Sequence, residues 1–147
     1  MPRVAVLAPM FRESTQVRVF PNGWTSQAEA FHPQAIAAPL PLLESLRGIA
    51  EPEHALIVFL FPWEPRVPEP SRDRLWRAFG VPIFEQVISE RGELLATECE
   101  AHDGLHIVSR DFAVGDHEMD SSRCACGETS PRWIAQPVHS RAIFAGR

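Results

Sequence analysis

The run Ala55-Leu56-Ile57-Val58-Phe59-Leu60-Phe61 is the most hydrophobic stretch of the sequence. Seven consecutive apolar residues, rich in β-branched and aromatic types and followed by Pro62, are typical of a strand that is buried on both faces. A chain of 147 residues is also long enough to build one substantial core. We therefore predict that this run forms a central strand around which the other elements pack.

Helical patterns flank the central run on both sides. Leucines at helical spacing predict a helix over residues 40–49. Four prolines within residues 62–70 predict an extended linker, after which Ser71 caps a second predicted helix that ends at Gly80.

Strand patterns complete the fold. Short apolar or alternating runs predict strands at residues 4–8, 82–88, 94–98 and 105–109. A weaker alternation at residues 15–20, directly before a Pro-Asn-Gly turn signal, favours a hairpin arm. The fold class predicted is α/β: a single domain over residues 1–147 with a mixed β-sheet flanked by helices and a β-rich C-terminal part. Residues 55–61 and 82–88 are expected to be neighbouring inner strands.

Composition narrows the possible functions. The formal net charge is −5 with no block of like charge, which argues against nucleic acid as a partner. The sequence contains no lysine, so all fourteen basic side chains are arginines and lysine-dependent catalysis is excluded for these residues. We find no membrane span and no signal-peptide pattern, and a cytoplasmic protein is expected.

All three cysteines lie in the β-rich C-terminal part. Cys99 precedes His102 and His106, and Cys124 and Cys126 follow about two dozen residues later. Three thiolates and one imidazole are a ligand set suited to tetrahedral Zn²⁺, and a reducing compartment disfavours disulfides. We predict a structural zinc site that ties this end of the fold. His102 is preferred as the fourth ligand because it lies three residues from Cys99, and His106 is the alternative.

Part of the chain resembles a known family. Phe79-Gly80-Val81-Pro82, then Glu98-Cys99-Glu100, Gly104-Leu105-His106 and finally Cys124-Ala125-Cys126-Gly127-Glu128-Thr129-Ser130-Pro131-Arg132 are similar, in this order, to segments of the phenylacetate-CoA ligase branch of the adenylate-forming enzymes. The similar region covers about residues 71–133. This resemblance implies an acyl-activating scaffold. The chain nevertheless departs from the family, because it has no Ser/Thr/Gly-rich phosphate loop and no lysine.

Three functions are compatible with these observations. The leading hypothesis is a non-enzymatic, zinc-stabilised accessory or interaction protein derived from an acyl-adenylate-forming ligase scaffold, with another protein as its partner. In this hypothesis Trp63, which stands between Pro62 and Pro65, is a candidate contact residue. The alternative is the acyl- or CoA-binding part of a split acyl-CoA ligase. The third is a small zinc hydrolase, with Glu98 or Glu100 as general base beside an open coordination position.

Overall fold

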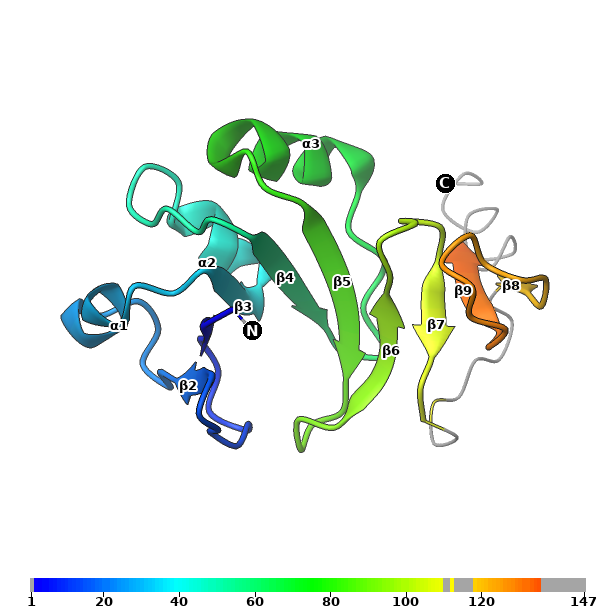
Figure 1. Ribbon diagram of the computed structural model, residues 1–147, viewed down its shortest axis with the longest axis horizontal. Coiled ribbons are helices and arrows are strands. Elements are labelled where there is room, and N and C mark those ends of the chain that lie inside the picture. Colours follow the sequence, from blue (N-terminus) through cyan, green and yellow to red (C-terminus); the bar gives the residue numbers. More distant parts are fainter. Residues whose placement is uncertain (1, 110–111, 113–117, 136–147) are drawn as a thin grey trace, which may run out of the picture.

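The computed structural model describes residues 2–109, 112 and 118–135 of the chain. Within them, nine strands form one mixed sheet in the order β2-β1-β3-β4-β5-β6-β7-β9-β8 (Figure 1). This architecture confirms the predicted α/β class with a mixed sheet. The strands are β1 (Val4–Val6), β2 (Val17–Val19), β3 (Ala35–Pro39), β4 (Ala55–Leu60), β5 (Ile83–Ile88), β6 (Leu94–Glu98), β7 (Leu105–Ile107), β8 (Glu118–Asp120) and β9 (Arg132–Ala135).

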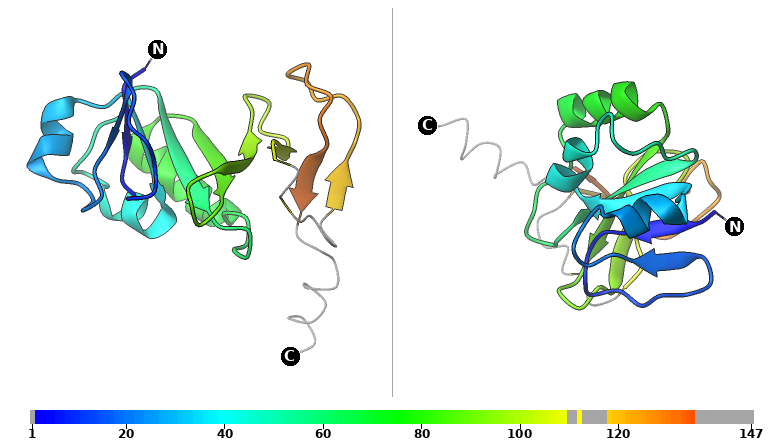
Figure 2. Two further views of the ribbon diagram at one scale, coloured as in Figure 1. Left: turned by 90° about the horizontal axis from the view of Figure 1, so that it is seen from below. Right: turned by 90° about the vertical axis from the view of Figure 1, so that its left-hand side faces the viewer.

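The direction of pairing divides the sheet into two halves. The strands from β2 to β5 are parallel to their neighbours, whereas every pairing from β5 onward to β8 is antiparallel. The first strands and the last strands therefore lie at opposite ends of the molecule (Figure 2). The cysteine-bearing segments all belong to the antiparallel half.

The central strand is β4, as its sequence predicts. It pairs with β3 on one side and with β5 on the other, so the expected neighbourhood of residues 55–61 and 82–88 is confirmed. Leu56 and Val58 are fully buried on one face of the sheet, and Phe59 is buried on the other.

Among the described residues, three helices cover one face of the sheet. They are α1 (Ser26–Phe31), α2 (Leu40–Ser45) and α3 (Glu69–Phe79), and their buried residues Ala28, Leu43 and Leu75 join the same core cluster as Leu56. The reason is topological. The crossovers from β2 to β3, from β3 to β4 and from β4 to β5 all advance in the same direction across the sheet, and right-handed crossovers then place their helices on the same face.

The opposite face has a smaller apolar cluster that no described helix covers. It includes Ala37, Phe59 and Ile88, and the loop after β1 contributes Phe11, whose ring stacks on Phe59 with centroids 4.7 Å apart. The connection from β1 to β2 runs in the direction opposite to the helical crossovers, which explains why it passes over this other face.

Two features of the parallel half differ from the sequence prediction. The segment expected as a hairpin arm is β2, which pairs in parallel with β1, so the hairpin prediction is wrong. The sequence analysis also missed β3. Its sequence, Ala-Ile-Ala-Ala-Pro, has a single β-branched residue and no alternation, because the strand lies inside the sheet and its first four residues are all buried.

None of the helices in the described part of the chain has the length and apolar content needed to cross a bilayer.

The central position of β4 generates a stability prediction. Replacement of the fully buried Leu56 by alanine should lower the free energy of unfolding by about 2–5 kcal/mol, because it removes apolar contacts and leaves a cavity. The matched control is Leu94→Ala in β6, where the side chain is 37% exposed, and its effect should be clearly smaller. Urea unfolding of both variants measures the difference, and equal losses would contradict the central role of β4.

Candidate metal centre and the adjoining ion-pair cluster

Three sulfurs and one imidazole converge in the antiparallel half of the sheet. Cys99 directly follows β6, His106 lies in β7, and Cys124 and Cys126 belong to the turn between β8 and β9. The four ligand atoms all lie within 4.8 Å of one another. The Sγ atoms of Cys99 and Cys124 are 3.5 Å apart, and Sγ of Cys126 is 3.5 Å from Nε2 of His106. A tetrahedral ion with metal–sulfur bonds of about 2.3 Å would separate its sulfur ligands by about 3.8 Å, so this group has the dimensions of a four-coordinate site.

A tight turn allows both cysteines of the Cys-x-Cys pair to face the same point. The N–H of Gly127 donates to the carbonyl of Cys124 over 2.9 Å, and the N–H of Cys124 donates to the carbonyl of Glu128 over 3.0 Å. Gly127 has φ of 97°, a conformation that side chains with a Cβ rarely adopt.

The protonation of the thiols depends on their surroundings. The pKa of Cys124 is lowered to about 7, chiefly because its sulfur accepts a hydrogen bond from the backbone N–H of Cys126. The pKa of Cys99 is raised to about 11, chiefly because burial disfavours its thiolate form. Near neutral pH Cys124 is therefore partly ionised, whereas Cys99 needs a nearby cation before it releases its proton.

The two histidines near Cys99 occupy different environments. His106 is buried, its Nε2 faces Cys126, and its Nδ1 lies 2.9 Å from Oγ of Ser130. His102 is not one of the four converging groups. Its Nδ1 lies 2.5 Å from Oε2 of Glu98, and its ring stacks on Phe84 with centroids 4.9 Å apart. The geometry thus brings together the three predicted cysteines and the alternative histidine, His106.

Arg132 fixes the loops around the candidate metal centre. This residue of β9 is 2% exposed, and its Nη1 atom donates to the backbone carbonyl of Asp103 and contacts that residue's carboxylate at 2.9 Å. Its Nη2 atom contacts the carboxylate of Asp120 at 3.1 Å. The segment after Cys99 and the segment before Cys124 are therefore held to the same side chain.

A close approach of backbones explains Gly104 in the same loop. A Cβ at this position would lie 2.7 Å from Cδ1 of Ile134 and 3.0 Å from the carbonyl oxygen of Trp133, and φ is 84°. Only glycine fits between the loop and β9 without displacing backbone.

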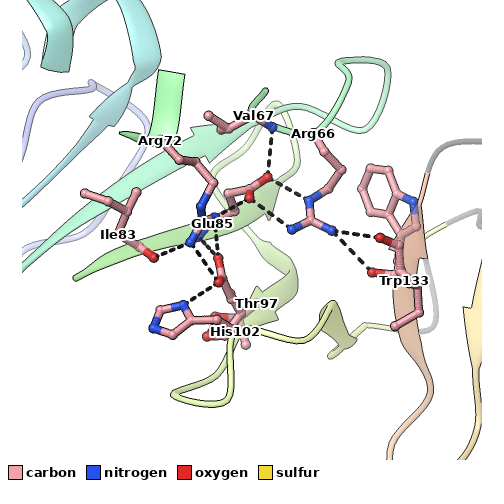
Figure 3. Close-up of polar contacts among 10 residues, drawn as sticks. Arg66, Val67, Arg72, Ile83, Glu85, Thr97, His102 and Trp133 are labelled. Atoms are coloured by element: carbon pink, nitrogen blue, oxygen red, sulfur yellow. Dashed lines mark hydrogen bonds and ion pairs between the residues drawn. The ribbon is translucent and has the colours of Figure 1, made fainter. Parts of the chain in front are cut away.

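A second polar cluster lies beneath α3, on the helix-covered face of the sheet. Glu85 of β5 is fully buried and Glu98 of β6 is 6% exposed. Arg72 of α3 bridges them, with Nη1 at 2.5 Å from Oε2 of Glu85 and at 2.9 Å from Oε1 of Glu98 (Figure 3). Arg66 contacts Oε1 of Glu85 at 2.7 Å. We call these four residues the ion-pair cluster.

Backbone groups complete the ion-pair cluster. The N–H of Val67 donates to Glu85, the N–H of Glu85 donates to Glu98, and Nη2 of Arg72 donates to the carbonyl of Ile83. Burial alone would raise the pKa of Glu85, but the contacts with Arg66, Val67 and Arg72 outweigh it and leave that pKa lowered. The buried carboxylate of Glu85 is thus ionised at neutral pH.

The sequence analysis did not find this cluster. In the sequence, Glu98 is a candidate general base and part of the ligase-like Glu98-Cys99-Glu100 segment, and neither Arg66 nor Arg72 belongs to a predicted site. One signal was available: Glu85 lies two residues after Ile83 and two before Val87, so strand alternation places it on their apolar face, and a buried carboxylate requires a cationic partner.

Together the fold and the site define an α/β protein with a thiolate-rich candidate metal centre at one end of a mixed sheet. The fold is similar to that of 2-hydroxyisobutyryl-CoA ligase. An open conformation of that enzyme, in complex with 2-HIB-AMP and CoA, matches with a TM-score of 0.60 and 14% identity over 90% of this chain and 43% of the ligase. Its postadenylation state in complex with R3-HIB-AMP matches with a TM-score of 0.56 and 14% identity over 89% of this chain and 42% of the ligase.

These similarities concern the fold alone, because the identity is low, and the present chain spans less than half the length of the ligase. The sequence matches no family model and no curated protein. The fold agrees with the scaffold that the sequence resemblance implies, whereas a ligase function and the phenylacetate-CoA ligase branch stay predictions.

The ion-pair cluster leads to a prediction about Arg72. Arg72→Met should destabilise the fold by about 3–5 kcal/mol at pH 7, because it leaves two buried carboxylates facing one another with Arg66 alone. Arg77→Met on the same helix is the matched control, since Arg77 is exposed and its pair with Asp73 contributes little.

The same substitution has a predicted pH dependence. In the wild type the lowered pKa of Glu85 stabilises the fold above the ordinary glutamate pKa, and this contribution is lost as pH falls through the lowered value. In Arg72→Met the carboxylates become neutral at higher pH, so the difference from wild type should shrink towards pH 4. Urea unfolding from pH 7 to pH 4 measures it, and a difference that stays constant would contradict the electrostatic explanation.

Proposed function

We propose that Cys99, His106, Cys124 and Cys126 bind one structural Zn²⁺ ion. The observation that carries this proposal is the convergence of their ligand atoms within 4.8 Å, from three segments far apart in the sequence. Three thiolates with one imidazole select zinc over the hard cations Mg²⁺ and Ca²⁺, which prefer oxygen ligands. The hydrogen bond between His106 and Ser130 supports the assignment, because metal-ligating histidines usually engage their second ring nitrogen with a polar partner.

A structural role for the ion is favoured over a catalytic one. Four protein ligands fill a tetrahedral site and leave no position for a reactive water. Glu98, one of the two candidate bases of the hydrolase hypothesis, has both oxygens engaged by Arg72, His102 and the backbone, and it is therefore not placed to act as a general base.

We infer that the protein acts as a non-enzymatic accessory or interaction protein on an acyl-CoA-ligase-like fold. The absence of lysine from the sequence supports this inference, because the resembled enzymes use a lysine in adenylation. A protein partner is the proposed ligand. Trp63 is the candidate contact: it is 65% exposed and its ring stacks on Phe61 with centroids 4.9 Å apart, which presents a preformed aromatic surface.

A second candidate is the acyl- or CoA-binding part of a split ligase. Two observations favour it: the similar ligase structures hold CoA or an acyl-AMP, and this chain spans 42–43% of their length. Thermal unfolding of the zinc-loaded protein with CoA and with short acyl-CoA esters separates the two candidates. A concentration-dependent rise in melting temperature supports the split-ligase candidate, and no rise with any of these ligands excludes it.

The metal assignment predicts one zinc ion per chain in purified protein. Cys124→Ser and His106→Gln should each lose most of the metal, whereas His102→Gln should retain it, because the imidazole of His102 contacts Glu98 and His102 reaches Cys99 through its backbone N–H. Loss of the ion should also lower thermal stability, since structural zinc contributes on the order of 10 kcal/mol of binding free energy. Elemental analysis and thermal unfolding measure these effects. Fully folded, metal-free wild type, or metal loss in His102→Gln alone, would overturn the ligand set.

Zinc affinity should also depend on pH in a defined direction. Binding requires the thiolate forms, so affinity should fall as pH drops through the pKa of about 7 of Cys124. The proton that Cys99 holds, with its pKa of about 11, should be released when zinc binds at neutral pH. Competition with a chromophoric chelator between pH 6 and 8 measures the affinity, and calorimetric zinc titration in two buffers of different ionisation enthalpy measures the proton release. A pH-independent affinity without proton release would contradict thiolate ligation.

A further inference from the structure

One buried donor beside the candidate metal centre has no acceptor. Nε of Arg132 is the only fully buried side-chain nitrogen or oxygen without a hydrogen-bond partner in the part of the chain that the structure describes. The other two nitrogens of this guanidinium are engaged, Nη1 by Asp103 and Nη2 by Asp120 and Ser122. A buried donor that stays unsatisfied costs about 1–3 kcal/mol, so an acceptor that the protein gains on binding a ligand would explain it.

Strand pairing places Arg132 beside the metal-binding group. Arg132 lies directly opposite His106 in the pairing of β7 with β9, and directly opposite Asp120 in the pairing of β8 with β9. Opposed residues of neighbouring strands project from the same face of a sheet. The guanidinium therefore lies on the face of His106, and Ser122, which accepts from Nη2 over 3.3 Å, is two residues before Cys124.

The segment that leads into β9 already supplies one outer contact of the candidate metal centre. Oγ of Ser130 lies 2.9 Å from Nδ1 of His106, on the side of the ring away from Cys126. Arg132 follows two residues later. The segment that orients the imidazole thus also carries the donor without a partner.

Charge indicates which acceptor is missing. Three thiolates and a divalent ion leave a net charge of −1 when the imidazole is neutral. Arg132 is the only buried arginine among the described residues, and a guanidinium that is removed from water requires a compensating anion. The carboxylates of Asp103 and Asp120 compensate it only in part, because these side chains are 64% and 40% exposed and solvent screens them.

The sulfur of Cys124 is the ligand atom best related to this cation. Cys124 is buried, and the segment that precedes it is held to Arg132 through Asp120 and Ser122. The pKa of Arg132 is raised first by its hydrogen bond with Asp103, and the negative charge of Cys124 contributes to the same shift.

We propose that Arg132 is a positioning residue of the metal centre: when the ion is bound, its Nε–H donates to the sulfur of Cys124, and its positive charge offsets that of the thiolate-bound ion. This inference rests on the proposed zinc site and extends it beyond the four ligands. The hydrogen bond favours the thiolate form of the sulfur, which is the form that binds the ion, and so strengthens metal binding.

Arg132→Lys isolates the proposed hydrogen bond. Lysine keeps a positive charge at this position but has a methylene group where arginine has Nε. Zinc affinity, measured by chelator competition on the full chain, should fall about 10–100-fold in this variant. Arg132→Met, which also removes the charge, should lose at least as much. Asp103→Asn and Asp120→Asn are the matched controls, because they remove the ion pairs that hold the loops and leave Nε in place. Both should weaken zinc binding less than Arg132→Lys does.

Co²⁺ in place of zinc provides a measurement that loop anchoring alone does not change. A hydrogen bond lowers the energy of the sulfur lone pairs, so the sulfur-to-cobalt charge-transfer absorption lies at higher energy while the bond is present. We expect this absorption to move to lower energy in Arg132→Lys and Arg132→Met and to stay in place in the two asparagine variants. An unmoved absorption in Arg132→Lys, or an equal shift in the asparagine variants, would overturn the role of Nε and leave the zinc site standing.

Nuclear magnetic resonance of the wild-type chain gives a test that needs no substitution. When zinc is added, the Nε–H proton of Arg132 should move downfield and exchange more slowly with solvent, because it gains an acceptor. A resonance that zinc leaves unchanged would refute the proposed hydrogen bond. A wild-type chain that binds neither Zn²⁺ nor Co²⁺ would overturn the zinc site and this inference together, so the two kinds of failure are distinguishable.

Discussion

Two glutamates, Glu85 and Glu98, lie opposite one another on adjacent strands, on the helix-covered face of the sheet. The position of α3 and of the segment that precedes it depends on the contacts that compensate their charge. The antiparallel register that pairs Gln86 with Thr97 and Val87 with Ala96 continues to bring Glu85 opposite Glu98. Like charges at directly opposed positions are destabilising, and burial makes the repulsion worse. Arg72 relieves it by binding both carboxylates at once, which fixes the position of α3 over the junction between β5 and β6.

The ion-pair cluster also joins the two halves of the fold. Arg66 lies in the segment between β4 and α3, yet its guanidinium reaches the carbonyls of Trp133 and Ile134 in β9 and stands over the Trp133 ring, 5.8 Å from the centroid. Glu98 belongs to the same cluster and immediately precedes Cys99. The parallel half and the cysteine-bearing half are therefore connected through buried charges as well as through the sheet. Substitution of either carboxylate should therefore affect the stability of both halves.

The sequence predicted those features that leave a local pattern. The apolar run of β4, the end of α3 at Gly80, and the neighbourhood of β4 and β5 follow from hydrophobicity and a helix-terminal glycine. The start of α3 was predicted wrongly, because the helix begins at Glu69 after Pro68 and Ser71 lies inside its first turn instead of capping it. By contrast, β3 was missed because alanines carry almost no strand preference, and β2 was misassigned because a short alternation does not reveal which strand it pairs with. The ion-pair cluster was missed because it depends on residues that meet only after folding, from Arg66 to Glu98. Local periodicity can indicate that Glu85 is buried, but it does not identify the arginines that contact it.

The choice between the two histidines follows from strand geometry rather than from sequence spacing. Side chains alternate between the faces of a strand, and the pairing of Thr97 with His106 and of Glu98 with Leu105 sets the faces of β6 and β7. Cys99, two residues beyond Thr97, continues on the face of His106, whereas Glu98 points to the helix-covered face. His102 follows a turn, where alternation no longer applies, and its φ of 52° directs it back to Glu98. The same alternation thus separates a thiolate-rich group on one face from a carboxylate-rich group on the other. The strand β6 therefore stands between the two groups.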